Sequence, residues 1–201
     1  MGFMKKLWTK LNNSNLPLDE KRLLWAVFTL TSWDPSVEAL STKTGEYNEV
    51  RTLTWQDVKV LETSMDNKAV KFLQLTLKQP KTSRTMPTQL VEIPELKGHI
   101  CAVIAFLKWS GGMKRRGQDL STPVFTRVNR DLVTTSYINK ILASLLKEED
   151  PKIMATAFRP SLFTILAQQG ANPEEVKALG HWTTKAYEAY IRKRRANNWR
   201  G

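Results

Sequence analysis

The carboxyl-terminal part of the sequence contains Thr156-Ala-Phe-Arg159, then Ala178-Leu-Gly-His181-Trp182 and, nine residues after the histidine, Tyr190. An arginine and a histidine can both donate hydrogen bonds to one phosphate group. A tyrosine hydroxyl on the next helix can attack the same phosphorus and form a covalent intermediate that keeps the bond energy for rejoining. Fixed cationic donors stabilise the charge that the transition state adds to the non-bridging oxygens. These residue types in this order predict phosphodiester chemistry.

The rest of the chain is strongly basic. Its 201 residues include 31 lysines and arginines against 19 aspartates and glutamates, which gives a formal net charge of +12. This excess favours nucleic acid as the partner and leaves an anionic membrane surface as the second choice. The sequence has no apolar run long enough to span a bilayer and no apolar stretch typical of a signal peptide. We therefore expect a soluble intracellular protein.

The sequence contains few cysteines and histidines, the side chains that form disulfides and bind zinc. Cys101 is the only cysteine, which excludes a disulfide framework and a multi-cysteine zinc site. His99 and His181 are the only histidines, so a histidine-based metal site is disfavoured. We expect neither a metal nor another cofactor.

Periodicity divides the chain into helices, a sheet and further helices. Helices are predicted over 18–31 and 35–40, strands over 50–60, 69–77 and 89–93, and helices from 96 to Gly111-Gly112 and over 133–146, 159–169, 173–179 and 183–195. Thr134 or Thr135 is the expected N-cap of the helix over 133–146. The predicted fold class is α+β and mostly helical, with a small antiparallel sheet packed against helices. A single domain is expected over 18–195, preceded by an extension or linker over 1–17 and followed by a basic tail over 196–201.

The motifs together resemble the catalytic domain of tyrosine recombinases, the phage-integrase family. That family has an arginine box, then Leu-Gly-His or Leu-Gly-Arg, then a tyrosine nine residues later, as Arg159, His181 and Tyr190 are spaced here. Upstream, the resemblance extends to three segments: Leu53-Thr-Trp55-Gln-Asp57-Val58, Pro80-Lys81-Thr82 and Pro123-Val-Phe125. It covers roughly residues 18–195, and the Gly-His-Trp wording is most similar to eukaryotic mobile-element members.

The resemblance implies a role for each matching residue. Tyr190 would be the nucleophile, Arg159 and His181 would bind the scissile phosphate, and Trp182 would buttress the histidine. Lys81 would protonate the leaving hydroxyl as the general acid, with Lys78 and Arg84 as nearby alternatives. Glu38 matches the glutamate that supports the phosphate site. Further contacts to DNA are expected from Lys78, Arg84, Arg192 and Arg194.

The resemblance also implies the partners and the setting. The partner would be duplex DNA, with the protein a monomer when free and a synaptic tetramer on DNA. It would act wherever its DNA lies, which is the nucleus in a eukaryote. Family members carry an additional amino-terminal DNA-binding domain, so we expect this chain to be an isolated catalytic domain or a fragment.

Two positions depart from the family pattern and keep a second hypothesis open. Pro35 stands where the family has an arginine, and Thr156 stands where it has a histidine or lysine. Losing a preorganised donor typically slows catalysis by about 10²–10³-fold. The chain would then be either a weakened recombinase or an inactive DNA-binding protein descended from a mobile element. An unrelated RNA-binding module ranks below both, because the sequence lacks a stacking pair of strand aromatics and a Gly-x-x-Gly clamp.

Each of these residues also has a purely structural interpretation. Tyr190 could be an aromatic side chain on an amphipathic helix, and His181 could cap a helix or lie in the core. Lys81 could be a solvated loop lysine. The spacing between His181 and Tyr190 favours the phosphate-binding interpretation for that pair.

Overall fold

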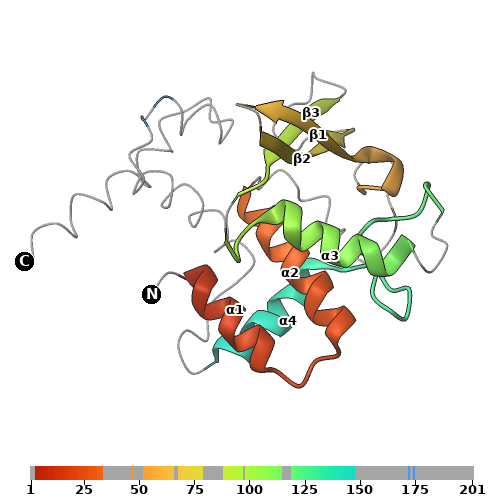
Figure 1. Cartoon of the computed structure of the whole chain (residues 1–201). Helices are drawn as coiled ribbons and strands as arrows, with labels where there is room; N and C mark the ends of the chain where they lie inside the picture. Colours follow the sequence, from red (N-terminus) through yellow and green to blue (C-terminus); the bar gives the residue numbers. More distant parts are fainter. Residues whose placement is uncertain are drawn as a thin grey trace, which may run out of the picture.

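The computed structural model describes residues 3–33, 47, 52–65, 68–78, 88–96, 98–114, 119–147, 172 and 174. Within them the chain forms α1 (Phe3–Asn13), α2 (Leu18–Trp33), η2 (Trp55–Asp57), β1 (Val58–Met65), β2 (Lys68–Leu77), β3 (Gln89–Pro94), α3 (Ala102–Lys114) and α4 (Thr135–Leu146). The sheet lies at one end of the helices, with α3 and α2 next to it and α1 and α4 beyond (Figure 1). The predicted α+β class, with a small antiparallel sheet packed against helices, is confirmed.

The central element is α2. It is apolar around most of its circumference, as expected for a helix that is packed on several sides. Leu23, Leu24 and Phe28 are fully buried. The buried hydroxyls of Thr29 and Ser32 donate hydrogen bonds to carbonyls one turn earlier, at 2.8 Å each, and so carry no unmet polar group into the core.

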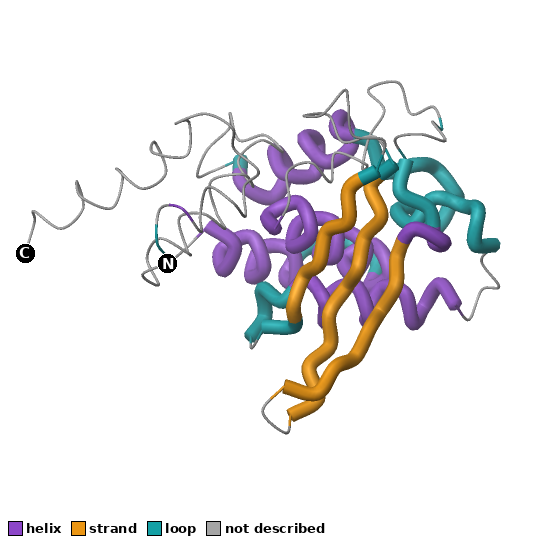
Figure 2. The backbone as a smooth tube through the Cα atoms, turned by 90° about the horizontal axis from the view of Figure 1, so that it is seen from above, coloured by secondary structure: helices purple, strands orange, loops and turns teal. Residues whose placement is uncertain are grey.

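The three strands form an antiparallel sheet in the order β1-β2-β3 (Figure 2). Leu75 of β2 lies opposite Val58 of β1 and Val91 of β3. Because side chains alternate between the two faces of a strand, Leu73, Leu75 and Leu77 point to one face. All three are buried, so this face packs on the helical layer, where α3 contacts β2 and β3.

The first helix, α1, lies inside the range 1–17, which the sequence assigns to an extension or linker. Met4, Leu7 and Leu11 follow one another at helical spacing, and all three are buried in the common core. The ring of Trp8 lies 4.6 Å from that of Trp25 on α2, measured between centroids. Residues 3–13 are thus packed against the helices that follow.

The strand predicted over 50–60 is wrong for residues 55–57. The alternation of Leu53, Trp55 and Asp57 imitates a strand, but the chain turns here into η2, and β1 begins only at Val58. The cause is local hydrogen bonding. The amide and the hydroxyl of Thr54 both donate to the Asp57 carboxylate, at 2.9 and 2.6 Å. This pairing favours a tight turn over an extended chain.

The helix predicted from residue 96 is also displaced. Gly98 has φ +106°, a left-handed conformation that interrupts a helix, and α3 begins only after Cys101. The Cys101 sulfur accepts the amides of Leu96 and Ile104 at 3.2 and 3.5 Å. At its other end α3 continues through Gly111-Gly112 to Lys114, because neither glycine adopts the left-handed conformation that ends a helix.

The prediction for α4 is confirmed, including its cap. Thr134 is the N-cap, and its side chain accepts the amide of Tyr137 at 3.1 Å. The helices expected over 35–40, 159–169 and 183–195 lie outside the described residues, as does the helix expected over 173–179 except for Glu174. None of the helices in the described ranges is both long enough and apolar enough to cross a membrane.

Candidate functional site

One of the sequence-predicted site residues, Lys78, lies within the described ranges. The others fall outside them: Glu38, Lys81, Arg84, Arg159, His181, Trp182, Tyr190, Arg192 and Arg194. The same holds for Pro35 and Thr156, the two positions that depart from the family pattern. Their roles remain predictions from the sequence. The described residues nevertheless form two polar clusters.

The first cluster joins Lys78 to Asp57 and Thr54. Lys78 follows the last residue of β2, and its Nζ lies 2.9 Å from Oδ2 of Asp57, the last residue before β1. The Asp57 side chain is 7% exposed and that of Lys78 is 31% exposed. Oδ2 of Asp57 also accepts the amide and the hydroxyl of Thr54. A nearly buried carboxylate therefore receives three donors, as a buried charge requires.

This cluster is attached to a second part of the chain. The amides of Trp55 and Gln56 donate to the carbonyls of Thr122 and Leu120, at 3.1 and 2.9 Å. The amide of Val124 donates to the carbonyl of Leu53 at 2.9 Å. The turn that holds Asp57 is thus fixed between the sheet and the loop that leads from α3 to α4.

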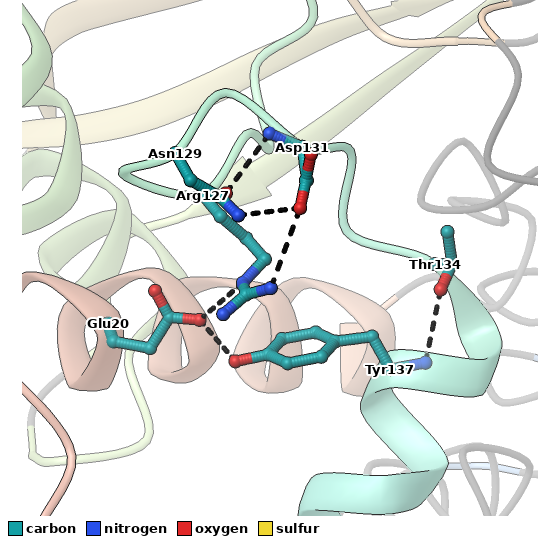
Figure 3. Close-up of polar contacts among 6 residues, drawn as sticks. All are labelled: Glu20, Arg127, Asn129, Asp131, Thr134 and Tyr137. Carbon is teal, nitrogen blue, oxygen red and sulfur yellow. Dashed lines mark hydrogen bonds and ion pairs between the residues drawn. The ribbon is translucent and has the colours of Figure 1, made fainter.

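The second cluster joins α2, the loop before α4, and α4 itself (Figure 3). Oε1 of Glu20 accepts the Nε–H of Arg127 at 3.1 Å and also accepts the hydroxyl of Tyr137. The guanidinium carbon of Arg127 lies 4.4 Å from the centre of the Tyr137 ring, in cation–π geometry. The side chain of Glu20 is 7% exposed. One carboxylate therefore holds together the amino-terminal ends of two helices.

The loop from Arg127 to Asp131 is a tight turn at the edge of this cluster. The amide of Arg127 donates to the carbonyl of Asp131 at 2.8 Å, and Arg130 adopts φ +70°. The Asn129 side-chain amide donates to the Asp131 carboxylate at 2.6 Å, as Figure 3 shows. Arg127 also lies 3.8 Å from that carboxylate. These bonds give the turn a fixed shape.

An open pocket of about 460 Å³ lies beside the turn and is lined by Arg127, Arg130, Asp131, Leu132, Thr134 and Tyr137. The charges of its two guanidinium groups are offset by Asp131, which also lines the pocket, and by Glu20, which pairs with Arg127. The pocket is therefore close to electroneutral. Within the described ranges, no group of three histidine, cysteine, aspartate or glutamate side chains could hold a metal ion.

Sequence reasoning does not find this second cluster. Glu20 reads as an acidic residue in the first turn of a helix, where the helix dipole alone would explain it. Its partners Arg127 and Tyr137 lie 107 and 117 residues away. No local pattern connects residues at such separations. The one indication in the sequence that Glu20 has a buried partner is its place among the apolar residues of the helix.

Tyr137 is poorly suited to attack a phosphate. Burial raises the pKa of its hydroxyl, and the hydrogen bond and negative charge of the Glu20 carboxylate raise that pKa further. The attacking species is the phenolate, so a raised pKa lowers its population. The environment of Tyr137 is that of a structural hydrogen-bond donor.

The raised pKa of Tyr137 predicts a pH dependence of stability. An ordinary tyrosine ionises near pH 10, so above that pH the unfolded chain loses this proton before the folded chain does. The stabilisation is complete below pH 10 and declines as pH rises beyond it. We expect the difference in unfolding free energy between wild type and Tyr137→Phe to shrink above about pH 10, by at most about 1 kcal/mol because the side chain is only half-buried. Urea unfolding of both proteins from pH 8 to 11 measures this, and parallel curves would contradict it.

Comparisons with known proteins show the fold. No protein-family model matches the sequence, and the curated proteins give no match. Among solved structures, the XerH site-specific recombinase bound to difH substrate, in a pre-cleavage complex, matches with a TM-score of 0.62 at 11% identity, over 100% of this chain and 54% of that one. Its post-cleavage complex with palindromic difH matches at 0.63 and 14%, over 98% and 51%.

A transposon enzyme has the same fold. The Tn1549 transposon integrase in complex with transposon right end DNA matches with a TM-score of 0.53 at 11% identity, over 98% of this chain and 64% of that one. The present chain thus spans between half and two thirds of the length of these proteins. At these identities the likeness establishes the fold of the tyrosine recombinase catalytic domain.

Proposed function

We propose that this chain cleaves and rejoins DNA strands at specific sites through a covalent 3′-phosphotyrosine intermediate. The observation that carries the proposal is the spacing of His181 and Tyr190 after Arg159, in a chain with the fold of recombinase catalytic domains. The similar XerH and Tn1549 structures are complexes with DNA. The net charge of +12 supports the same partner.

The proposed chemistry uses side chains of this chain only. The Tyr190 oxygen forms a bond to the scissile phosphorus while the bond from phosphorus to the 5′-oxygen breaks. The phenol releases its proton to the solvent, and the leaving oxygen takes a proton from Lys81, which regains one from the solvent, so the protons balance and nothing is oxidised or reduced. Arg159 and His181 stabilise the charge on the non-bridging oxygens. Attack by a free 5′-hydroxyl on the phosphotyrosine reverses these steps and rejoins a strand.

Pro35 and Thr156 favour a second candidate, an inactive DNA-binding protein derived from a mobile-element recombinase. Both stand where the family places polar groups of the phosphate site. We therefore infer that the reaction is slower than in family members with the complete set.

We also infer that the active form is a homo-oligomer assembled on DNA from free monomers. Its setting is inside the cell, with DNA, in the nucleus if the host is eukaryotic.

A suicide-substrate assay separates the two candidates. Duplex DNA with a nick close to the scissile phosphate loses the short 5′-hydroxyl fragment after cleavage, so the protein stays attached. The recombinase proposal requires a protein–DNA band on a denaturing gel. Binding of the same duplex without any such band identifies the inactive protein. No binding would contradict both candidates.

DNA affinity should depend steeply on salt. If about six phosphates are contacted, the affinity should fall about a thousandfold between 50 and 200 mM salt. Replacing Arg192 and Arg194 together by alanine should reduce the slope of log K against log salt by about 2, since each arginine is expected to contact one phosphate. Fluorescence anisotropy titrations measure both slopes. Binding that does not respond to salt would contradict the proposed interface.

A further inference from the structure

We propose that Lys78 is a positioning residue, which anchors the link between β2 and β3, and that it is not the general acid. This inference rests on the proposed function, because it concerns which lysine protonates the leaving 5′-oxygen. The sequence leaves Lys78 and Lys81 open for that role, three residues apart in the same link. The contacts of Lys78 separate the two.

Lys78 and Asp57 meet because the sheet is antiparallel. Val58 at the start of β1 lies opposite Leu75 near the end of β2, so the residues just outside these strands lie at the same end of the sheet. The ion pair of 2.9 Å between Lys78 and Asp57 joins the two chain segments there. On the other side of the link, Gln89 opens β3 opposite Leu77. The chain therefore leaves the sheet at Lys78 and returns to it at Gln89, which is paired with Leu77.

The ion pair is expensive to break. Asp57 has a nearly buried side chain, and its Oδ2 is the atom that accepts Lys78 and both donors of Thr54. Removing the ammonium group would leave a desolvated carboxylate without its counter-charge. A general acid must point its proton at the substrate, so Lys78 would have to abandon this carboxylate in every catalytic cycle. Its geometry suits a fixed anchor.

The residue that anchors Lys78, Asp57, is itself held in place by backbone hydrogen bonds. Asp57 belongs to η2, whose amides are bonded to the carbonyls of Leu120 and Thr122 in the loop after α3. Lys78 thus ties the first residue of the link to the sheet and to this loop at once. A misplacement of about 1 Å can slow catalysis by about 10²-fold. Loss of the anchor should therefore reduce proton delivery by Lys81 without removing the acid itself.

The test compares variants on two suicide substrates. One has the ordinary 5′-oxygen at the scissile phosphate, and the other has sulfur in its place, which leaves as a thiolate and needs little help from an acid because a thiol ionises near pH 8.5. We expect Lys78→Arg, which keeps the ion pair but is a very weak acid, to stay within about threefold of wild type on oxygen. Lys78→Met and Asp57→Asn should be about 10- to 100-fold slower on oxygen and close to wild type on sulfur.

Each other outcome overturns the inference. If Lys78→Arg is as slow as Lys78→Met on oxygen while Asp57→Asn is normal, then Lys78 is the acid. If sulfur does not restore Lys78→Met, its defect is general loss of structure. If Lys78→Met cleaves at the wild-type rate, Lys78 has no role in cleavage. Lys71→Met, which removes an exposed lysine from the adjoining strand β2, is the matched control and should cleave like wild type. Thermal unfolding verifies that every variant is folded.

The proposed function fails in a different way. A wild-type protein that forms no covalent complex with either substrate would contradict strand cleavage itself, and the assignment of Lys78 would fall with it. A wild-type protein that reacts with both substrates supports cleavage. The variants then decide the role of Lys78 alone.

Discussion

Tyr190→Phe is expected to abolish covalent attachment to DNA while leaving DNA affinity almost unchanged. The substitution removes the attacking oxygen and keeps the ring, so the packing of the side chain should survive. No other group on the same ring can take the place of the hydroxyl. The expected loss in the rate of adduct formation therefore exceeds about 10³-fold. A nicked-substrate gel measures attachment, and anisotropy with an intact duplex measures affinity.

Two other tyrosines supply matched controls. Tyr187 lies three residues before Tyr190 in the sequence, and Tyr187→Phe should leave attachment intact. Tyr137 donates its hydroxyl to Glu20, so Tyr137→Phe should also form the adduct. Adduct formation by Tyr190→Phe, together with its loss in Tyr187→Phe, would overturn the assignment of the nucleophile.

Glu20→Ala is expected to lower the free energy of unfolding by about 2–3 kcal/mol. The substitution leaves the Arg127 guanidinium without its near partner and the Tyr137 hydroxyl without its acceptor. Removing one member of a buried pair costs about 3–5 kcal/mol, and the lower value here reflects that the Arg127 side chain is 33% exposed. Urea unfolding at pH 7 gives the difference directly.

The neighbouring carboxylate provides the control for this second prediction. Asp19 also stands in the first turn of α2, but it faces Arg22 at 3.8 Å with both side chains 37% exposed. Asp19→Ala should cost at most about 1 kcal/mol, since exposed pairs and the helix dipole contribute little. Equal losses for the two substitutions would show that the cluster around Glu20 has no special weight.

The sequence predicts the elements whose patterns are local. The apolar spacing of α2, the alternation of β2 and the Thr134 cap of α4 each depend on residues that are close together in the chain. The errors occur where hydrogen bonds override such a pattern. Thr54 and Asp57 fold an alternating stretch into a turn, and the left-handed Gly98 delays the start of α3 until after Cys101.

The same distinction between local patterns and distant contacts applies to the candidate site. Motif spacing predicts that Arg159 and His181 bind a phosphate and that Tyr190 attacks it, because that signal lies in the sequence itself. Motif spacing does not distinguish Lys78 from Lys81, because the difference is a contact between Lys78 and Asp57. Asp57 precedes β1 and Lys78 follows β2, so the two residues are separated in the sequence by both strands. The pairing of Glu20 with Arg127 is equally invisible, because burial and a distant partner together make it important.

The residue that carries the DNA phosphate after cleavage is the nucleophile, and it can be identified by mass spectrometry. Nicked duplexes with randomised flanking sequence would be incubated with the protein, covalent complexes recovered by phenol partition, and the DNA trimmed by nuclease. Trypsin then releases residues 186–192, which hold both Tyr187 and Tyr190, and fragmentation mass spectrometry assigns the modified residue. We expect a phosphate adduct on Tyr190. An adduct on any other residue, or no adduct from duplexes that the protein binds, would contradict it.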